Sequence, residues 1–484
     1  MAFCDLREFL QLLEAEDEMA RIRREVTPGD EVAAIVWETN TRRGPALLFE
    51  KVRGSAHSLV ANVHGTYARI ALALGLPKHS SVRALRDHYA AVLMNKREWP
   101  QPAMVESGPC KEVILKGDDV DLFKFPIFQW HPGDGGAYIT LNATTTKDPG
   151  FGRNVGIYRV NVFDRKTTGI MALMMQDIGI HLALAKKRGQ GGLPVAIVCG
   201  LDPTIYLAGT TKMGHVGDDE FAFAGALRGE PVELVRCETI DVDVPATAEI
   251  VIEGELRHDE PTREGPFGEW MEYYEEQMIT PTFHVACITH RRDAIYQSCS
   301  VGHQYGENEI IRTIPLQSNF YNELKERVIG FRDCLIPLEG RGYKAIVQIH
   351  KRYPGWAKQA IYAAFGTGYG TASVNQVTVV DEDIDIYDPL RVDFAEATRV
   401  DPQRDVVMLP PMGVYPLNPS ARARYEAEST GLTEFAWCSK MGVDATKKFA
   451  VEGRKTAELV HPPEETLERV RQNWQQYFGK GSER

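Results

Sequence analysis

The sequence predicts an α+β protein in which a strand-rich barrel is followed by a smaller α/β domain. From about Cys110 to His290, short β-branched or aromatic runs alternate with Gly, Pro and Asp turns, and only two helical segments interrupt them. Such a pattern is typical of a closed or split barrel rather than of a doubly wound sheet. A long helical pattern from Asn308 to Val328 follows, and then a β-α-β rhythm from Tyr343 to Val380. The 484 residues are enough for two or three such domains.

Residues 1–109 are expected to mix helices with short strands and to pack on the barrel. Asp5 is a suitable N-cap for a helix to about Met19, because Leu6, Phe9, Leu10 and Leu13 then share one face. Strands are expected at Ala46–Phe49 and Leu59–Val63, and helices at Tyr67–Leu76 and Val82–Asn95.

The expected barrel covers residues 110–305. Its strand runs are Tyr138–Leu141, Val155–Val162, Ile170–Met175, Val195–Val198, Ile250–Ile252 and Phe283–Ile288. The two helical inserts are expected near Ile178–Lys187 and Glu220–Leu227. The chain contains no repeated GxGxxG or Walker-type phosphate loop.

The rest of the chain divides into a linker helix at 306–330, an α/β domain at 331–430 and a tail at 431–484. Within it, Pro410–Gly413 and Pro416–Pro419 predict an irregular connector. The tail carries an amphipathic helix from about Pro463 to Phe478, whose apolar stripe is Leu467, Val470, Trp474 and Phe478. Such a stripe usually packs internally, but a helix outside two finished domains also predicts contact within a homodimer or a higher homo-oligomer.

Composition predicts a soluble cytoplasmic protein. The formal net charge of -12 argues against a nucleic-acid partner, which needs a basic face. The first residues lack the apolar segment of a signal peptide, and no apolar run approaches the roughly 20 residues of a membrane span. Eight scattered cysteines without a CxxC pair indicate reduced, mostly buried thiols.

Two carboxylates flank a Gly-Pro-Phe-Gly turn, in the order Glu264, Gly265–Gly268, Glu269. A turn of this composition cannot continue a helix, and a stiff backbone can aim both acids into one cavity for acid-base chemistry. The alternative is a solvated acidic loop, which is the more common reason for such a pattern.

Upstream, Asn154 and Arg159 lie in a strand-like run. They are an odd number of positions apart and face opposite sides of a regular strand, unless Gly156 breaks the strand with a bulge. Arg159 would then offer a planar fork to a carboxylate or a phosphate. An ordinary arginine on an edge strand is the other interpretation.

Asn154, Asp177 and Glu220 would supply three oxygen ligands at strand or helix ends. Oxygen ligands suit a hard cation such as Mg²⁺ or Mn²⁺ that bridges to a phosphate. Acids near the start of a helix are also ordinary capping residues, so Glu220 alone indicates little.

These segments together resemble the UbiD family of prenylated-FMN-dependent, reversible decarboxylases. The resemblance covers most of the chain. It rests on Asn154-x4-Arg159, on Asp218–Glu220 running into Ala224–Pro231, on Glu264–Glu269, on the opening segments Asp5–Leu10 and Ala46–Glu50, and on the closing segments Val379–Asp385 and Lys440–Thr446.

The resemblance implies a catalytic set of Arg159, Glu264 and Glu269. Glu269 would be the general acid that protonates the carbon that has lost CO₂, with a pKa raised by burial beside the second acid. Arg159 would pair with Glu264 and orient the substrate carboxylate. The modified flavin would serve as the covalent electron sink.

The resemblance also implies a cofactor site in the barrel. Asn154, Asp177 and Glu220 would hold a divalent metal, Mn²⁺ or Mg²⁺, that anchors the cofactor phosphate, and K⁺ is a further candidate ion. Asp177 departs from the family, where His is usual, and Lys212 occupies a position often held by Met. The flavin would be lined by Asn154, Val155, Gly156, Ile157, Tyr158, Arg159, Gln176, Asp177, Thr210, Thr211, Lys212, Met213 and Glu220.

The implied function is decarboxylation of an α,β-unsaturated or aromatic carboxylic acid, with a flavin prenyltransferase as the source of the cofactor. The implied fold is a flavin-binding split barrel joined by the long helix to an α/β oligomerisation domain. Ile314 and Pro410–Leu417 are pocket candidates, nothing there is basic enough to predict a phosphorylated substrate, and the Asp177 departure indicates a specialised member acting on an aliphatic unsaturated acid. The alternatives are an FMN-dependent oxidoreductase on a split barrel, although no motif for a hydride donor is present, and a non-catalytic flavin- or metal-binding module.

Overall fold

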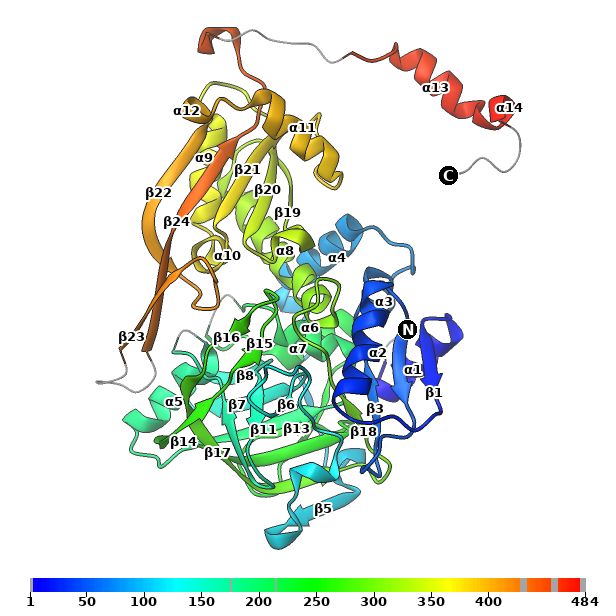
Figure 1. Ribbon diagram of the computed structural model, residues 1–484, viewed down its shortest axis with the longest axis vertical. Coiled ribbons are helices and arrows are strands. Elements are labelled where there is room, and N and C mark those ends of the chain that lie inside the picture. Colours follow the sequence, from blue (N-terminus) through cyan, green and yellow to red (C-terminus); the bar gives the residue numbers. More distant parts are fainter. Residues whose placement is uncertain (1–2, 175, 214–215, 427–432, 454–459, 479–484) are drawn as a thin grey trace.

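The chain forms a mixed α/β structure with two large parts, one on a nine-stranded sheet and one on a six-stranded sheet. Helix α8 (Glu307–Arg327) lies at the junction between them (Figure 1). The computed structural model describes residues 3–174, 176–213, 216–426, 433–453 and 460–478.

The N-terminal part is tied to the larger part by a shared sheet of order β1-β2-β3-β18, whose last strand comes from residues 295–297. Its first helix begins at Leu6, because the Asp5 side chain accepts a hydrogen bond from the Glu8 amide. The helix ends before the expected Met19, because Asp17 takes a left-handed conformation (φ 59°) and Met19 begins a strand. The elements are α1 (Leu6–Ala15), β1 (Met19–Ile22), α2 (Asp30–Thr41), β2 (Ala46–Phe49), β3 (Ser58–Ala61), α3 (Tyr67–Ala73), α4 (Val82–Met94) and β4 (Ala103–Met104).

The nine-stranded sheet is a half-barrel of antiparallel pairs in the order β6-β9-β10-β17-β14-β11-β7-β8, with β5 paired to β17. Two expected strands differ. The run Val155–Val162 is divided between β8 and β9, and the run from Ile170 ends at that residue, while Met175 lies outside the described residues. The strands are β5 (Val113–Lys116), β6 (Ala137–Ile139), β7 (Ala143–Asp148), β8 (Gly152–Gly156), β9 (Val160–Val162), β10 (Thr167–Ile170), β11 (Leu193–Cys199), β14 (Ile250–Glu264) and β17 (Met278–His290), while β18 (Ile295–Gln297) belongs to the N-terminal sheet.

Both faces of this sheet are buried, as β11 illustrates. Val195 and Ile197 belong to one hydrophobic cluster, and Ala196 and Val198 belong to another. The cluster of Val195 and Ile197 is covered by α2 and α5 (Asp177–Lys187). The cluster of Ala196 and Val198 is covered by α6 (Pro203–Gly209) and α7 (Glu220–Arg228). Smaller sheets, made of β12 (Glu233–Arg236), β13 (Asp243–Pro245) and β4, and of β15 (Phe267–Gly268) and β16 (Tyr274–Glu275), complete this part.

The second large part is a six-stranded sheet in the order β19-β20-β21-β24-β22, with β23 paired to β24. Strand β24 lies beyond residue 430, so the sheet extends into the range that we expected to be tail. Its elements are β19 (Phe331–Leu335), β20 (Lys344–Ile349), α9 (Trp356–Phe365), α10 (Gly368–Ala372), β21 (Gln376–Asp381), α11 (Pro389–Arg399), α12 (Pro402–Asp405), β22 (Val406–Val414), β23 (Arg422–Glu426) and β24 (Thr433–Asp444).

Pro410 and Pro411 lie inside strand β22, where we expected an irregular connector. The strand tolerates them because it lies at the end of the sheet order and its register with β24 is irregular between Leu409 and Met412. At such a position the missing amide protons of proline cost no regular ladder bonds.

Helix α8 contains Pro315 and remains continuous. Proline lacks the amide that would donate to the carbonyl four residues earlier. The Thr210 hydroxyl donates to that carbonyl, the oxygen of Ile311, at 3.4 Å. A side chain from the half-barrel therefore supports α8 at its weakest point.

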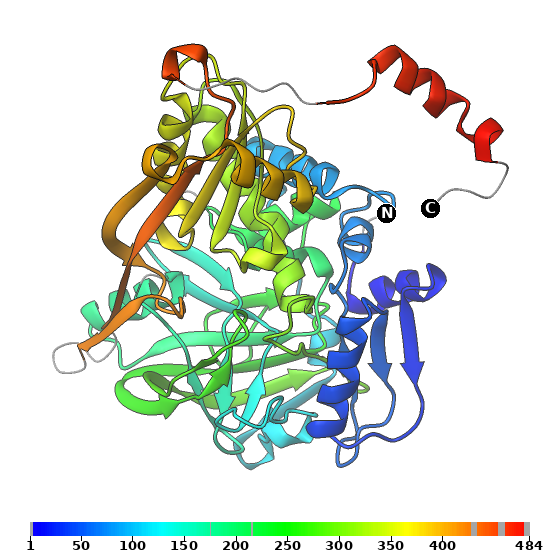
Figure 2. The ribbon, with the colours of Figure 1, turned by 45° about the horizontal axis from the view of Figure 1, so that its top comes forward.

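The chain ends in α13 (Glu464–Gln472) and α14 (Trp474–Phe478), which stand apart from both large parts (Figures 1 and 2). The single helix that we expected from Pro463 to Phe478 is therefore divided at Asn473. Within the described ranges, no helix combines the length and apolar character needed to cross a membrane. The eight cysteines are free thiols, and six of them are buried.

Candidate active site

The segment Glu264–Glu269 is not a solvated loop. Glu264 ends β14, Gly265 turns the chain with φ 94°, and Glu269 follows β15. The Glu264 side chain is fully buried, and Glu269 is only 6% exposed. Burying two carboxylates costs several kcal/mol unless each is paired, so the structure must provide a cation or a proton.

Arg159 provides the cation to both acids. Its Nε and Nη2 donate to Glu264 Oε1 and Oε2 at 2.9 and 2.8 Å, and its Nη1 donates to Glu269 Oε1 at 2.5 Å. Burial alone would lower the pKa of the guanidinium, but the two carboxylates outweigh it, so the pKa of Arg159 is raised overall. We expected Arg159 to hold Glu264, and the structure adds the contact with Glu269.

Arg159 reaches the acids because the strand is interrupted, not bulged. Strand β8 ends at Gly156, and β9 begins at Val160. Between them the Tyr158 ring folds against Gly156, where a Cβ atom would lie 2.6 Å from the ring. Glycine at position 156 therefore leaves room for the Tyr158 ring in the break between β8 and β9, and Asn154 and Arg159 belong to two different clusters of side chains.

Tyr138 is a member of this site that the sequence analysis missed. Its hydroxyl donates to Glu264 Oε1 at 2.8 Å, and its ring lies 4.4 Å from that of Phe267, centroid to centroid. Glu264 therefore accepts three hydrogen bonds, one from Tyr138 and two from Arg159. The strand pattern around Tyr138 indicated a core residue and gave no sign of this role.

The turn from His131 to Gly136 supports the loop between the acids. Asp134 accepts hydrogen bonds from the Gly268 amide at 2.9 Å and from the His131 amide at 2.8 Å, while the Gly135 amide donates to Pro266 O at 2.7 Å. The approach is so close that a Cβ on Gly135 would lie 2.1 Å from Gly265 O. The Asp-Gly-Gly sequence marks a turn, but its partner could not be inferred from the sequence.

A second acidic cluster lies where β8, α5 and α7 meet. Glu220, the first residue of α7, is buried and accepts a hydrogen bond from the Val155 amide at 3.2 Å. Burial, helped by the charges of Asp219 and Asp177, raises its pKa well above the ordinary value. Burial also raises the pKa of Asp177, and the charge of Lys212 opposes this shift.

Asn154 adjoins the same cluster. Its amide nitrogen donates to Thr146 Oγ1 at 3.3 Å. Burial raises the pKa of the neighbouring Tyr158 hydroxyl, a hydrogen bond to Asn154 opposes the rise, and the charges of Asp177 and Glu220 add to it. The structure therefore brings together Asn154, Asp177 and Glu220.

This donor set fits a divalent cation. The buried carboxylate of Glu220, the half-buried carboxylate of Asp177 and the amide oxygen of Asn154 are hard oxygen ligands. Burial is the largest cause of the raised pKa of both acids, and a bound cation would favour their charged forms. The described part of the chain contains no cluster of three or more His, Cys, Asp or Glu side chains suited to a metal ion. Further ligands would have to come from the cofactor or from water, and the metal stays a prediction.

Among the other residues predicted to contact the flavin, some have hydroxyls that are hydrogen-bonded within the chain, and others have side chains that are exposed or half-buried. The Thr211 hydroxyl is bonded to Tyr89 at 2.6 Å, and the Thr210 hydroxyl to the carbonyls of Leu207 and Ile311, so neither hydroxyl is free for a ligand. Lys212 is exposed, while Met213 and Ile157 are half-buried.

Gln176 connects the half-barrel to the second large part. Its side-chain nitrogen donates to the Tyr415 hydroxyl at 2.9 Å. Burial, and then the charge of Glu269, raises the pKa of Tyr415 to about 12, and the charges of Arg312 and Arg159 oppose the rise. The expected pocket region Pro410–Leu417 therefore brings Tyr415 close to the catalytic acids, whereas Ile314 is fully buried in the core.

Three sequence profiles of one family match the chain. The 3-octaprenyl-4-hydroxybenzoate carboxy-lyase (UbiD) N-terminal domain matches residues 10–88, the Rift-related domain residues 103–304, and the C-terminal domain residues 311–445. An uncharacterised protein of Archaeoglobus fulgidus is 36% identical over 500 aligned positions, which cover 98% of this chain and 98% of the relative.

Solved structures agree with the profiles. The UbiD-class enzyme HmfF from Pelotomaculum thermopropionicum, an evolved dimeric form in complex with prFMN, has a TM-score of 0.81 and 32% identity, and the match covers 97% of this chain and 99% of that chain. The vanillic acid decarboxylase of Sedimentibacter hydroxybenzoicus in its closed form has a TM-score of 0.86 and 32% identity, covering 98% of this chain and 99% of that chain.

Proposed function

The chain belongs to the UbiD family, and from this premise we propose that it is a non-oxidative, reversible decarboxylase of an α,β-unsaturated or aromatic carboxylic acid. Its cofactor would be prenylated FMN, supplied by a flavin prenyltransferase. The observation that carries the proposal is the buried Arg159, which hydrogen-bonds to both Glu264 and Glu269. A redox reaction would have no use for such a pair of acids around one cation.

Glu269 is the proposed proton donor. It contacts Arg159 through a single oxygen, whereas both oxygens of Glu264 are held. A substrate carboxylate that approaches Arg159 Nη1 would compete with Glu269 for this donor. Released from the cation, Glu269 could hold a proton and deliver it to the carbon that loses CO₂.

Glu264 and Tyr138 would keep Arg159 in place during this exchange. The two-point contact with Glu264 fixes the plane of the guanidinium. The Tyr138 hydroxyl and the Arg159 Nε both donate to Oε1, so Glu264 would keep its contact with Arg159 while Glu269 delivers the proton. The two acids would thus have different roles, set by their different contacts.

When bound, the prenylated flavin would supply the sink for the electron pair released with CO₂. Asn154, Asp177 and Glu220 would hold Mn²⁺ or Mg²⁺ against the cofactor phosphate, with K⁺ as a further candidate ion. The residues from Val155 to Tyr158, together with Gln176 and the loop from Thr210 to Met213, would line the cofactor. On this proposal the half-barrel is one side of a split barrel that binds the flavin.

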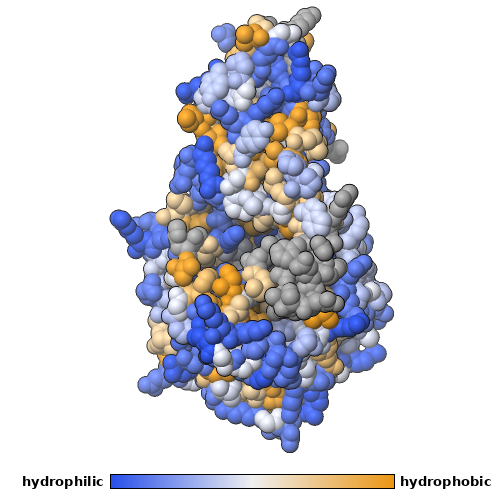
Figure 3. Space-filling model, turned by 90° about the vertical axis from the view of Figure 1, so that its left-hand side faces the viewer, coloured by the Kyte–Doolittle hydropathy of each residue, from blue (hydrophilic) through white to orange (hydrophobic). Residues whose placement is uncertain are grey.

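The second large part would serve oligomerisation, and a homodimer or a higher homo-oligomer is proposed. On the face shown in Figure 3, hydrophobic side chains gather on both sides of the waist between the two parts. Met408 of β22, at the end of the sheet order, is 63% exposed. Light scattering of the purified chain tests this part of the proposal, and a monomer at all concentrations would contradict it.

The test of the function is CO₂ release. The chain is co-produced with a flavin prenyltransferase and screened by mass spectrometry against unsaturated and aromatic acids, with no NAD(P)H present. Loss of 44 mass units from an acid supports the decarboxylase. Absence of turnover by a chain that carries the prenylated flavin, together with NAD(P)H-dependent reduction of bound FMN, would support the oxidoreductase.

A further inference from the structure

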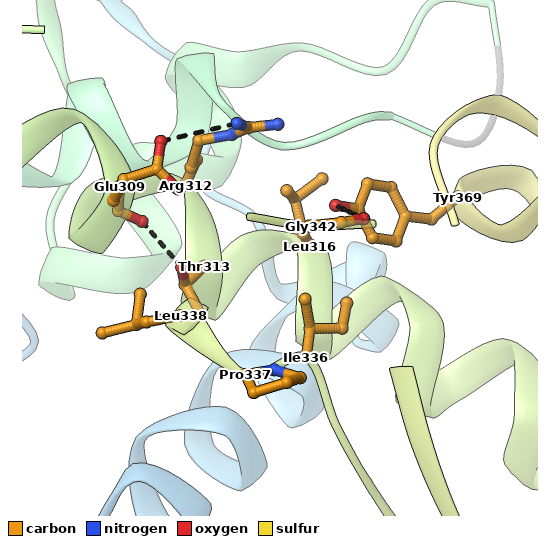
Figure 4. Close-up of a pocket in the computed structure, with 9 residues that line it drawn as sticks. All are labelled: Glu309, Arg312, Thr313, Leu316, Ile336, Pro337, Leu338, Gly342 and Tyr369. Carbon is orange, nitrogen blue, oxygen red and sulfur yellow. Dashed lines mark hydrogen bonds and ion pairs between the residues drawn. The ribbon is translucent and has the colours of Figure 1, made fainter. Parts of the chain in front are cut away.

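The guanidinium of Arg312, on helix α8, is incompletely hydrogen-bonded within the described part of the chain. Its Nη1 is buried and has no partner among the described residues. A small cavity lies beside it, lined by Glu309, Arg312 and Thr313 of α8 and by Pro337, Leu338 and Tyr369 of the second large part (Figure 4). Arg312 is half-buried, with 19% of its side chain exposed, and a buried guanidinium nitrogen without a hydrogen bond is costly, so this position calls for a ligand or a function.

The neighbouring charged groups are also incompletely paired. Glu309 Oε1 lies 3.7 Å from Arg312 Nη1, too far for a hydrogen bond, and it has no partner among the described residues. Arg341 Nη1 lies 4.0 Å from Glu309 Oε2 and is likewise unpartnered in the described part of the chain, while its Nη2 is paired with Glu272. Two guanidinium groups thus face one carboxylate.

This cluster adjoins the catalytic acids. The Arg312 Cζ atom lies 3.8 Å from the ring centroid of Trp270, which directly follows Glu269. The pKa of Tyr343 is raised by burial, and the charges of both Arg312 and Glu269 act on its hydroxyl. Tyr415 is likewise within electrostatic reach of Arg312, Glu269 and Arg159. Arg312 therefore contacts the residue that follows the proposed proton donor, and its charge reaches the same two tyrosines.

We propose that the substrate carries a second anionic group, remote from the carboxylate that leaves, and that Arg312 binds this group. The inference rests on the proposed function and names its substrate class: an unsaturated or aromatic diacid. The substrate skeleton would lie between Arg159 and Arg312, against Trp270 and the tyrosines.

An anion fits this cluster better than a neutral group. Arginine offers a planar set of donors that matches a carboxylate. Burial raises the pKa of Glu309, and the charge of Glu269 adds to the rise while both arginines oppose it. A protonated Glu309 would donate to the anion, so the same three groups would be satisfied by one bound carboxylate.

Binding is measured first, because it does not require turnover. Holoenzyme with Glu269→Gln, which prevents decarboxylation, is titrated by calorimetry with two pairs of acids: benzoate with terephthalate, and crotonate with fumarate. We expect the diacid of at least one pair to bind about 10- to 100-fold more tightly than its monoacid, as for a hydrogen bond to a charged group.

Adding Arg312→Gln should reduce this ratio to about one while leaving the affinity for the monoacid within about twofold. Arg312→Lys keeps the charge and should restore part of the preference, and it also serves if the Gln variant does not fold. The matched control is Arg327→Gln, the same substitution at the half-exposed end of α8, where the arginine pairs with Glu323. It should keep the full ratio.

Glu269→Gln holoenzyme that binds neither diacid more tightly than its monoacid overturns the inference. So does an added Arg312→Gln that weakens the binding of both acids equally, which indicates a purely structural role. Tighter binding of 4-hydroxybenzoate than of terephthalate overturns it in favour of a hydroxyl ligand. CO₂ release is scored separately. A diacid preference without turnover of any acid supports the Arg312 site and contradicts the decarboxylase.

Discussion

Two acidic clusters lie buried in the half-barrel, and they balance their charge in different ways. Around Arg159, both Glu264 and Glu269 have hydrogen bonds to a cation from the same chain. Around Asn154, by contrast, the pKa values of half-buried Asp177 and buried Glu220 are raised, and the charge of the exposed Lys212 opposes the shift of Asp177. One cluster is complete within the protein, and the other is not.

The difference between the two clusters indicates which of them would bind a cation. A cluster whose carboxylates are hydrogen-bonded to a cation of the same chain keeps its geometry without a ligand, as a catalytic set must. A cluster of acids without a counter-ion is instead stabilised when it binds a cation. The comparison therefore predicts chemistry at the first cluster and cation binding at the second, and the four predictions below test this division in order of decreasing effect.

Removing the cation from the first cluster should have the largest effect. Arg159→Gln leaves two buried carboxylates without a counter-ion, and it should lower the free energy of unfolding by about 3–5 kcal/mol and abolish CO₂ release. Urea denaturation measures the first effect. The control is Arg165→Gln, which breaks a half-exposed pair with Asp121 and should cost at most about 1 kcal/mol. Equal losses for the two variants would contradict the assignment.

Glu269→Gln keeps the shape of the side chain but removes the acid. Turnover should fall by about 10²- to 10⁴-fold, the usual contribution of a general acid, while the absorption spectrum of the bound flavin stays the same. Single-turnover CO₂ release is the measurement. The exposed Glu276, on the same hairpin, provides the control as Glu276→Gln. Wild-type turnover by Glu269→Gln would remove Glu269 from the mechanism.

The second cluster should respond to metal and pH. The pKa values of Asp177 and Glu220 are raised above 3.8 and 4.5, so these groups stabilise the metal-free fold fully only below those values. This stability is lost as the pH rises through the raised pKa values. Mn²⁺ or Mg²⁺ should reverse the loss, by about 2.7 kcal/mol at a hundredfold excess over Kd.

Urea unfolding at several pH values, with and without metal, measures this effect. Glu220→Gln removes one of the two charges, so it should flatten the pH dependence of the metal-free protein and weaken the response to metal. The same pH slope and the same metal response in wild type and variant would show that the cluster does not bind the cation.

The smallest effect is expected from Tyr138→Phe. Glu264 keeps its two bonds from Arg159 and loses one, so the cost should be about 1.5 kcal/mol, the low end for a hydrogen bond to a charged group. Turnover should fall by less than about tenfold. Tyr274→Phe is the control, because its hydroxyl only accepts a bond from the Gly133 amide. A hundredfold loss of turnover would make Tyr138 part of the chemistry.

The sequence predicted much of the fold, because hydrophobic period and turn residues are local signals. The start of the helix after Asp5, the strand Ala46–Phe49 and the helix that begins at Val82 lie where the pattern placed them. The prediction of an irregular connector at Pro410 and Pro411 was wrong. Their place in a strand depends on the position of that strand at the sheet edge and on its irregular pairing with β24. Such a position is a property of the assembled sheet.

The candidate site shows the same limit. Motif resemblance named Arg159, Glu264 and Glu269, and the structure brings their side chains into contact. Tyr138, Asp134 and Arg312 carry no motif, because each acts through a partner more than 40 residues away in the chain or on another element. Contacts of this kind follow from tertiary packing and have no local sequence signal.

The close approach of Gly135 to the carbonyl of Gly265 has a consequence for protein engineering. In a library that varies every codon, substitutions at Gly135 and Gly265 should be rare among the active variants, although neither residue has a side chain that could react. A scan scored by CO₂ release would thus mark a zone of intolerance that extends through the His131–Gly136 turn. Redesign of the substrate preference should leave these positions unchanged and vary the residues of α8 around Arg312 instead.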